Sequence, residues 1–247
     1  MSLKIIGGVY GGRVLRSVRG MGTRPLLGQV REALFNILAD RIDGAVVWDL
    51  FAGSGASGIE ALSHGAAAAM FCEKNGRAVD VLKQNLRMLG DEAMARALVL
   101  RADAWNPPVV GRDAYGHMAA PHGGAADGAD DGPTAGAGDG AADGEQAAPA
   151  PELRPDVVFL DPPYDLVAED PVKSMARARA LLHRTAPQGC VVFHFETGVL
   201  DEDDFDADLD VDLREWGRTA IAMLWRKGEA PERLQRRWAK ERAGEDA

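Results

Sequence analysis

The sequence predicts an α/β protein built around a mostly parallel β-sheet. From Ala45 onward, short apolar runs typical of strands alternate with longer segments of helical periodicity, as in parallel strands joined by crossover helices. A glycine-rich turn joins the first of these strands to the first helix, and two apolar runs that flank Gly217 indicate a final antiparallel pair. We therefore expect helices on both faces of the sheet and a reversed hairpin at its end.

The expected elements follow in chain order. Residues 3–19 contain short apolar pieces broken by glycines, which predict a small β-hairpin with a basic face. A helix is expected from Gln29 to Ile42, where apolar residues recur on one side. The expected strands are Val46–Leu50, Ala69–Glu73, Leu98–Arg101, Val157–Leu160 and Cys190–Phe195, then Leu213–Trp216 and Thr219–Trp225. The expected helices between them run from about Ser57 to His64, from Asn75 to Leu89 and near Val172–Leu182.

Composition indicates one substantial domain with appendages. The chain has 247 residues, 46% of them hydrophobic, which is ample for a core. No segment approaches the roughly 18–20 apolar residues of a membrane span, and the glycine-broken N-terminus does not resemble a secretory signal. Cys72 and Cys190 lie in apolar runs, and neither they nor the five histidines form a metal-ligand pattern. We expect reduced thiols, no metal, no membrane contact and a cytoplasmic location.

The distribution of charge matters more than its sum of −10. Residues 113–152 contain eight acidic residues and no Lys or Arg, whereas residues 1–41 contain seven basic residues against two acidic ones. The chain is therefore acidic overall with a basic front end, a pattern compatible with binding RNA.

We divide the chain into a basic N-terminal extension with a helix (1–43), a main domain (44–227) and a basic tail (228–247). An insertion at about 111–152 consists mostly of Ala, Gly, Asp and Pro and lacks apolar periodicity. This composition predicts a disordered insertion within a surface loop of the domain.

The glycine-rich turn indicates a nucleotide-cofactor loop. Gly53, Gly55 and Gly58 have the spacing G-x-G-x-x-G between a strand and a helix, which suits a dinucleotide or S-adenosylmethionine; a purely structural turn is the alternative. Asp49 precedes this loop at the end of the strand. Its carboxylate would repel a pyrophosphate, so an NAD-dependent oxidoreductase is the weakest hypothesis. It suits the ammonium and sulfonium of S-adenosylmethionine, the cofactor we expect.

Two further acidic residues follow the next strands. Glu73, after the second strand, can accept hydrogen bonds from both ribose hydroxyls of the cofactor. Asp103, after the third strand, can accept from the adenine amino group, with Ala104 as a backbone partner; a surface aspartate is the alternative.

The tetrapeptide D-P-P-Y (Asp161, Pro162, Pro163, Tyr164) predicts a clamp for an exocyclic amine. It follows an apolar strand, so it lies at the carboxyl edge of the sheet, beside the glycine loop. Asp161 and the Pro162 carbonyl can accept the two N–H donors of the amine, and Tyr164 can stack on the base, which is worth about 1–3 kcal/mol. Catalysis would rest on positioning rather than on a strong general base. The alternative is an ordinary proline-rich turn.

These motifs resemble a known family. D-x-F-x-G-S-G at Asp49–Gly55, the acid after the second strand and D-P-P-Y are similar to class I S-adenosylmethionine-dependent methyltransferases of exocyclic amines. I-I-G-G-x-x-x-G-R-x-L from Ile5, T-R-P at Thr23–Pro25 and V-R-E-A-L-F-N from Val30 resemble the bacterial 16S rRNA guanine-N2 methyltransferase family, called RsmD. The resemblance covers residues 4–110 and 153–227.

The resemblance implies a Rossmann-like, seven-stranded sheet with a C-terminal antiparallel hairpin. It implies methylation of the N2 amine of a guanine in 16S rRNA, within the 30S subunit or its assembly intermediate, and we expect a monomer. The residues it assigns to the cofactor are Asp49, Phe51, Gly53, Ser54, Gly55, Glu73, Lys74, Asp103 and Ala104. It assigns Asp161, Pro162, Pro163 and Tyr164 to the guanine, and Arg13, Arg24 and Arg31 to RNA.

The chain departs from the family after T-R-P, where T-x-D-R is usual and Leu26–Gln29 stands instead. The change removes polar positions on the substrate side and leaves the cofactor motifs intact. Two other hypotheses stay open: an adenine-N6 methyltransferase of DNA or another RNA, since D-P-P-Y is shared, and a non-catalytic RNA-binding or assembly protein with the same fold. Intact Asp161 and Tyr164 count against the second, because a pure binder needs no amine clamp.

Overall fold

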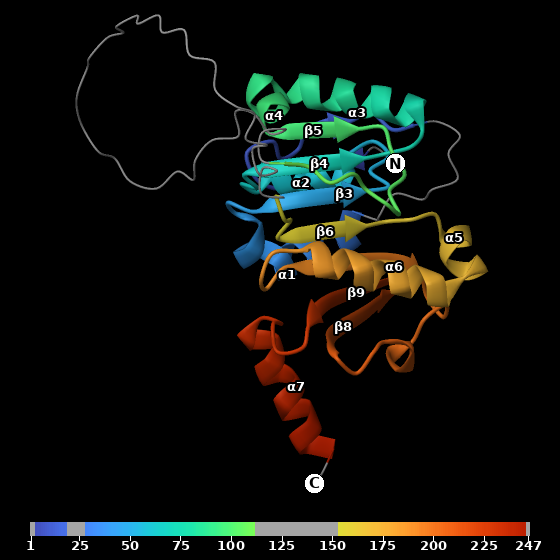
Figure 1. Cartoon of the computed structure of the whole chain (residues 1–247). Coiled ribbons are helices and arrows are strands. Elements are labelled where there is room, and N and C mark those ends of the chain that lie inside the picture. The colour runs from blue at the N-terminus through green and yellow to red at the C-terminus, as the bar shows by residue number, and fades with distance from the viewer. Residues whose placement is uncertain (1–2, 19–27, 112–152, 246–247) are drawn as a thin grey trace, which may run out of the picture.

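The structure is a computed structural model that describes residues 3–18, 28–111 and 153–245. Its centre is a seven-stranded sheet in the order β5-β4-β3-β6-β7-β9-β8 (Figure 1). The strands of this sheet are β3 (Val46–Leu50), β4 (Ala68–Cys72), β5 (Ala97–Leu100), β6 (Val157–Leu160), β7 (Cys190–Glu196), β8 (Leu209–Trp216) and β9 (Thr219–Arg226). A separate two-stranded ribbon pairs β1 (Leu3–Lys4) with β2 (Val14–Leu15).

The strand directions confirm the predicted α/β fold. Strands β3 to β7 pair in parallel, and β9 pairs antiparallel with both β7 and β8. The helices are α1 (Gly28–Ile42), α2 (Ala56–Ser63), α3 (Gly76–Leu89), α4 (Asp91–Ala95), α5 (Tyr164–Glu169), α6 (Pro171–Arg184) and α7 (Glu232–Glu245). A short 3₁₀ helix spans Glu202–Asp204.

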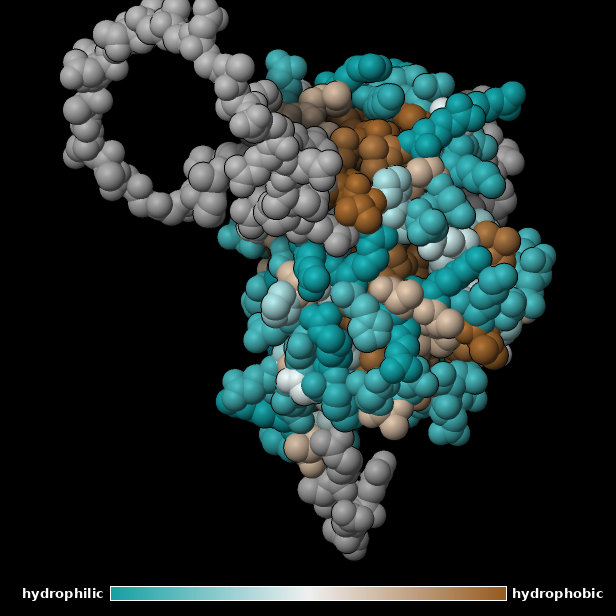
Figure 2. Space-filling view, viewed as in Figure 1, coloured by the Kyte–Doolittle hydropathy of each residue, from teal (hydrophilic) through white to brown (hydrophobic). Residues whose placement is uncertain are grey.

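Successive side chains of a strand point to opposite faces of the sheet, so the sheet contributes to a hydrophobic core on each face. On one face, Val47 and Phe159 pack with α1, while Phe71 packs with α2 and α3. On the other face, Trp48, Leu160 and other buried residues pack beneath α6, which lies in front of the sheet in Figure 1. Viewed from that side, hydrophobic surface gathers towards the β5 and α4 side of the molecule, and hydrophilic surface covers most of the opposite half (Figure 2).

The N-terminal ribbon is packed onto the domain. Ile5, Tyr10 and Leu15 are buried in a cluster with residues of α2 and α3. Glu60 of α2 is fully buried and accepts hydrogen bonds from the backbone amides of Ile6 and Gly7. The ribbon is therefore attached through both apolar packing and a buried carboxylate.

Several boundaries differ from the predicted ones. Strand β8 begins at Leu209, four residues before the expected start, because Asp210 and Asp212 are buried with partners: Asp210 accepts from Gly228 N, and Asp212 pairs with Arg237. The predicted insertion lies almost wholly outside the described residues.

The basic tail begins against the core. Ala230 and Leu234 are buried in the α1 cluster, and Arg233 of α7 pairs with Asp40 of α1. In the part of the chain that the structure describes, no helix is long and apolar enough to cross a membrane.

Candidate active site

The candidate site lies where four parallel strands end. Leu50 of β3 is in register with Cys72 of β4 and with Leu160 of β6, and Cys72 is in register with Leu100 of β5. The segments that follow these strands therefore leave the sheet side by side at its carboxyl edge. This is the edge where open α/β sheets bind ligands, and the predicted cofactor loop and amine clamp both lie on it.

The structure favours glycine at each of the three glycine positions of the loop, for reasons that differ between them. Gly53 has φ 54° and Gly55 has φ 84°, a region that favours glycine. At Gly55 a Cβ would lie 2.2 Å from Leu82 Cδ1, and at Gly58 it would lie 2.3 Å from Phe71 Cε1. At Gly53 the nearest heavy atom would be the Phe51 carbonyl oxygen, 3.9 Å away. Gly55 and Gly58 are thus required by packing, whereas open space borders Gly53.

Asp49 lies beneath the loop instead of on its surface. It is 2% exposed, and its Oδ2 accepts a hydrogen bond from Gly58 N at 2.8 Å. Burial raises the pKa of Asp49 well above its ordinary value of 3.8, opposed by the Gly58 hydrogen bond and reinforced by the charges of Asp161 and Glu73. Asp49, Glu73 and Asp161, at the ends of β3, β4 and β6, therefore act on one another electrostatically.

Glu73 fastens two loops together. Its Oε2 accepts from Gly53 N at 2.9 Å, and its Oε1 accepts from Asn75 N at 2.7 Å. Each carboxylate oxygen has a second lone pair available for a ligand hydroxyl. Asn75 in turn caps α3 by accepting from Arg77 N and Ala78 N. Lys74 is exposed between these two residues, and its carbonyl accepts from Arg101.

The segment after β5 holds Asp103 at the surface. Asp103 is exposed, and its Oδ1 accepts from Trp105 N at 3.1 Å, while Ala104 is buried. The Trp105 ring meets Phe51 edge-on with centroids 5.1 Å apart, and Phe51 has φ 59°, which is unusual for a residue with a side chain. Trp105 was not among the predicted site residues, although it stands two positions after Asp103.

The D-P-P-Y segment is part of a larger network. Asp161 Oδ1 lies 2.5 Å from Nδ1 of His194, and Nε2 of His194 lies 2.9 Å from the Tyr164 hydroxyl. That hydroxyl also lies 3.2 Å from Thr219 Oγ1. Pro163 ends the loop, since its carbonyl accepts from Leu166 N in α5. His194 was not among the predicted site residues, although it contacts two of them, Asp161 and Tyr164.

The residues predicted to contact RNA have different environments. Arg13 is exposed on the ribbon, with its guanidinium 5.3 Å from the centre of the Tyr10 ring. Arg24 lies outside the described residues. Arg31 is 2% exposed, its Nε lies 3.3 Å from Glu60, and it donates to the Lys4 carbonyl. The predicted RNA contact of Arg31 is therefore wrong, because this side chain is used inside the protein.

A buried asparagine links the ribbon to the cofactor loop. Asn85 of α3 accepts from Arg16 N at 2.8 Å, and its Nδ2 donates to the carbonyls of Arg16 and Ser54. Asn85 is fully buried. The sequence shows only a polar residue on the apolar side of a helix at this position, and that pattern does not identify the hydrogen-bond partners of Asn85.

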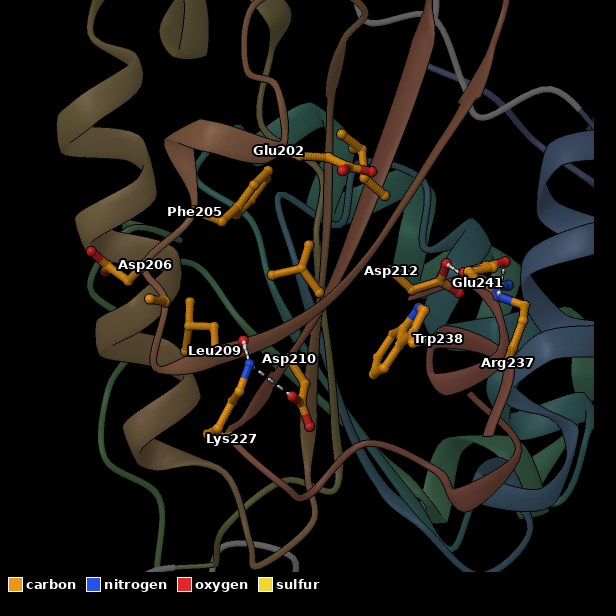
Figure 3. A pocket seen from close by; sticks show the side chains of 13 residues that line it. Glu202, Phe205, Asp206, Leu209, Asp210, Asp212, Lys227, Arg237, Trp238 and Glu241 are labelled. Atoms are coloured by element: carbon orange, nitrogen blue, oxygen red, sulfur yellow. Dashed lines mark hydrogen bonds and ion pairs between the residues drawn. The ribbon is translucent and has the colours of Figure 1, made fainter. Parts of the chain in front are cut away.

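A groove of about 490 Å³ lies elsewhere, between β8 and α7 (Figure 3). Three of its acidic side chains have cationic partners: Asp210 pairs with Lys227, and Asp212 and Glu241 pair with Arg237. The groove lies three strands beyond β6 in the sheet order. It is therefore remote from the carboxyl-edge loops and is not the candidate active site.

Comparisons with known proteins find similarity over the first part of the chain. Residues 3–107 match the family described as "Conserved hypothetical protein 95". The chain is 41% identical over 102 residues to "Putative rRNA methyltransferase YlbH" of Bacillus subtilis, covering 41% of this chain and 54% of that protein. It is 46% identical over 87 residues to "Ribosomal RNA small subunit methyltransferase D" of Escherichia coli K12, covering 35% and 44%. The matched stretch thus spans about half the length of these curated relatives.

Solved structures extend the similarity beyond that stretch. The structure titled "Putative methyltransferase yhhF from Escherichia coli" has a TM-score of 0.60 and 24% identity, covering 92% of this chain and 98% of that one. This likeness shows the fold. The similarity in sequence thus extends over residues 3–107, and the similarity in fold extends over most of the chain.

Proposed function

We propose that this protein transfers a methyl group from S-adenosylmethionine to the exocyclic N2 amine of a guanine in 16S rRNA. The observation that carries the proposal is the register of β3 and β6. Leu50 and Leu160 are partners in adjacent strands, so the glycine loop and D-P-P-Y emerge next to each other. A cofactor loop beside an amine clamp is the arrangement that methyl transfer to nitrogen requires.

The residues present fit S-adenosylmethionine. The open space at Gly53 permits a ligand to approach the backbone, and Glu73 beside it has lone pairs for the ribose hydroxyls. A cationic ligand above the buried Asp49 would favour the ionised carboxylate, which would then supply negative charge beneath the ligand. We assign Phe51, Ser54, Gly55, Lys74, Asp103 and Ala104 to the same cofactor site. When bound, S-adenosylmethionine supplies an electrophilic methyl group on a sulfonium centre.

The clamp positions the amine without a strong base. Asp161 accepts one N–H of the amine and the Pro162 carbonyl accepts the other, which directs the nitrogen lone pair towards the methyl group. Pro162 and Pro163 fix the backbone here, since proline restricts φ. Tyr164 stacks on the base. Because the amine must leave its stack to reach the site, the substrate guanine is flipped out.

The N-terminal ribbon is the part we assign to holding the RNA. It carries the exposed Arg13, and Asn85 ties its backbone to the cofactor loop. Arg24 completes this proposed contact. Arg31 contributes indirectly, by helping Glu60 to hold the ribbon in place. The 30S subunit or its assembly intermediate is the proposed partner.

A paired substitution tests the clamp. Asp161→Ala should abolish methyl transfer to 30S subunits while cofactor affinity, measured by calorimetry, changes only a few-fold. Asp165→Ala is the matched control, because Asp165 is an exposed aspartate nearby in the sequence, in the first turn of α5. Near wild-type turnover in Asp161→Ala, or equal losses in both variants, would refute the clamp.

A further inference from the structure

We infer that His194 is the positioning residue of the clamp, holding Asp161 and Tyr164 in one arrangement. The inference rests on the proposed function and goes beyond it, since it assigns the geometry of the clamp to a side chain outside D-P-P-Y. Three adjacent strands bring the groups together. Asp161 follows β6, His194 is in β7, and Thr219 opens β9.

The hydrogen-bond partners determine that Nδ1 of His194 carries a proton. The Asp161 carboxylate has no proton to donate, so Nδ1 of His194 must donate to Oδ1 across the 2.5 Å contact. Burial raises the pKa of Tyr164 above its ordinary value of 10.0, so its hydroxyl keeps its proton at neutral pH. A hydroxyl can both donate and accept, so that of Tyr164 can bond at once with Nε2 of His194 and with Oγ1 of Thr219. Asp161, His194, Tyr164 and Thr219 are thus joined by hydrogen bonds in one continuous series.

This arrangement prepares both parts of the clamp for the base. With Oδ1 of Asp161 held by His194, Oδ2 bears no hydrogen bond from any described residue and can accept the substrate amine. The Asp161 side chain is 33% exposed, whereas that of His194 is 3% exposed. The imidazole therefore acts from behind the carboxylate, and a substrate would reach Asp161 first.

The same imidazole also fixes the stacking ring. Tyr164 meets His194 edge-on, with ring centroids 5.2 Å apart and planes at 74°. One buried ring thus sets the distance between the aromatic platform for the base and the acceptor for its amine. A misplaced reacting group can cost about 10²-fold in rate, so loss of this link should lower kcat more than it weakens cofactor binding.

Substitution by leucine and by asparagine separates positioning from packing. His194→Leu fills the space without either hydrogen bond and should lower kcat by about 10- to 100-fold, with cofactor affinity unchanged within about threefold. His194→Asn retains a donor near the position of Nδ1 and should recover at least half of that loss on a logarithmic scale. Val192→Ala is the packing control, because Val192 is buried on the same face of β7. Its kcat should stay near wild type even where its stability falls.

Three results would overturn the inference: wild-type kcat in His194→Leu, no recovery in His194→Asn, or an equal kcat loss in Val192→Ala. Nitrogen-15 NMR of the His194 ring should show a proton on Nδ1, and protonation at Nε2 alone would refute the assignment. The NMR arm does not depend on turnover, so failure of the proposed function is distinguishable from failure of this inference.

Discussion

Replacing Glu60 by glutamine removes a negative charge from the interior where the ribbon, α1 and α2 meet. The Glu60 carboxylate is fully buried, lies 3.3 Å from Nε of Arg31, and accepts from Ile6 N and from Gly7 N at 2.9 Å. Burial lowers the pKa of the Arg31 guanidinium below its ordinary value, and Glu60 partly offsets that effect. Glutamine keeps the shape of the side chain but turns one acceptor into a donor facing other donors.

The expected cost is large. Breaking a buried ion pair while leaving one charge behind costs about 3–5 kcal/mol, a substantial part of a typical stability of about 5–15 kcal/mol. Glu92→Gln is the matched control, since Glu92 also pairs with an arginine but its side chain is 78% exposed. An exposed pair of this kind contributes about 0–1 kcal/mol.

Urea unfolding at pH 7 measures the free-energy difference, and hydrogen exchange at Ile6 and Gly7 shows whether the ribbon detaches first. The double variant Arg31→Met/Glu60→Gln should recover part of the loss, because it removes the unpaired buried cation. A Glu60→Gln variant within about 1 kcal/mol of wild type, or a double variant less stable than Glu60→Gln alone, would refute a buried ion pair as the attachment of the ribbon.

Three other predictions follow from the same structure. Because burial raises the pKa of Asp49, its carboxyl group binds a proton more tightly in the folded protein than in the unfolded chain. The contribution of Asp49 to stability should therefore fall as pH rises from about 3.8 through the raised pKa. Urea unfolding across pH should therefore show wild type losing stability relative to Asp49→Asn, and a pH-independent difference would contradict this. Gly55→Ala should lower stability by about 1–3 kcal/mol through its clash, whereas Gly53→Ala should chiefly weaken cofactor binding; calorimetry and thermal unfolding separate the two, and equal effects would oppose the assignment. Burial raises the pKa of Cys72 and Cys190 to about 12, so neither thiol should react with a disulfide reagent before unfolding, and rapid native labelling would be inconsistent with this.

Much of the fold could be predicted because it depends on local patterns. The alternation of apolar strands and amphipathic helices located the parallel sheet, and the pair around Gly217 located the reversed hairpin. The start of β8 could not be predicted in the same way. Asp210 and Asp212 resemble exposed acids until their partners Gly228 and Arg237 are known, and these lie 18 and 25 residues away in sequence.

The residues of the candidate site could likewise be predicted only in part. The motif spacing placed the glycine loop and D-P-P-Y, since parallel strands end at one edge. Arg31 and His194 were misjudged or undervalued because their partners are distant in sequence. A basic residue within a basic segment suggests RNA until Glu60 is found beside it, and a histidine within a strand gives no sign of Asp161, 33 residues earlier.

The most direct measurement is methyl transfer from labelled S-adenosylmethionine to 30S subunits that lack the modification, followed by nucleoside analysis of the 16S rRNA. The proposed function predicts labelled N2-methylguanosine from the wild-type protein and none from Asp161→Ala. Label in N6-methyladenosine would contradict the proposed substrate while keeping an amine clamp. Absence of label from a protein that binds the cofactor would contradict the proposed 16S rRNA substrate itself.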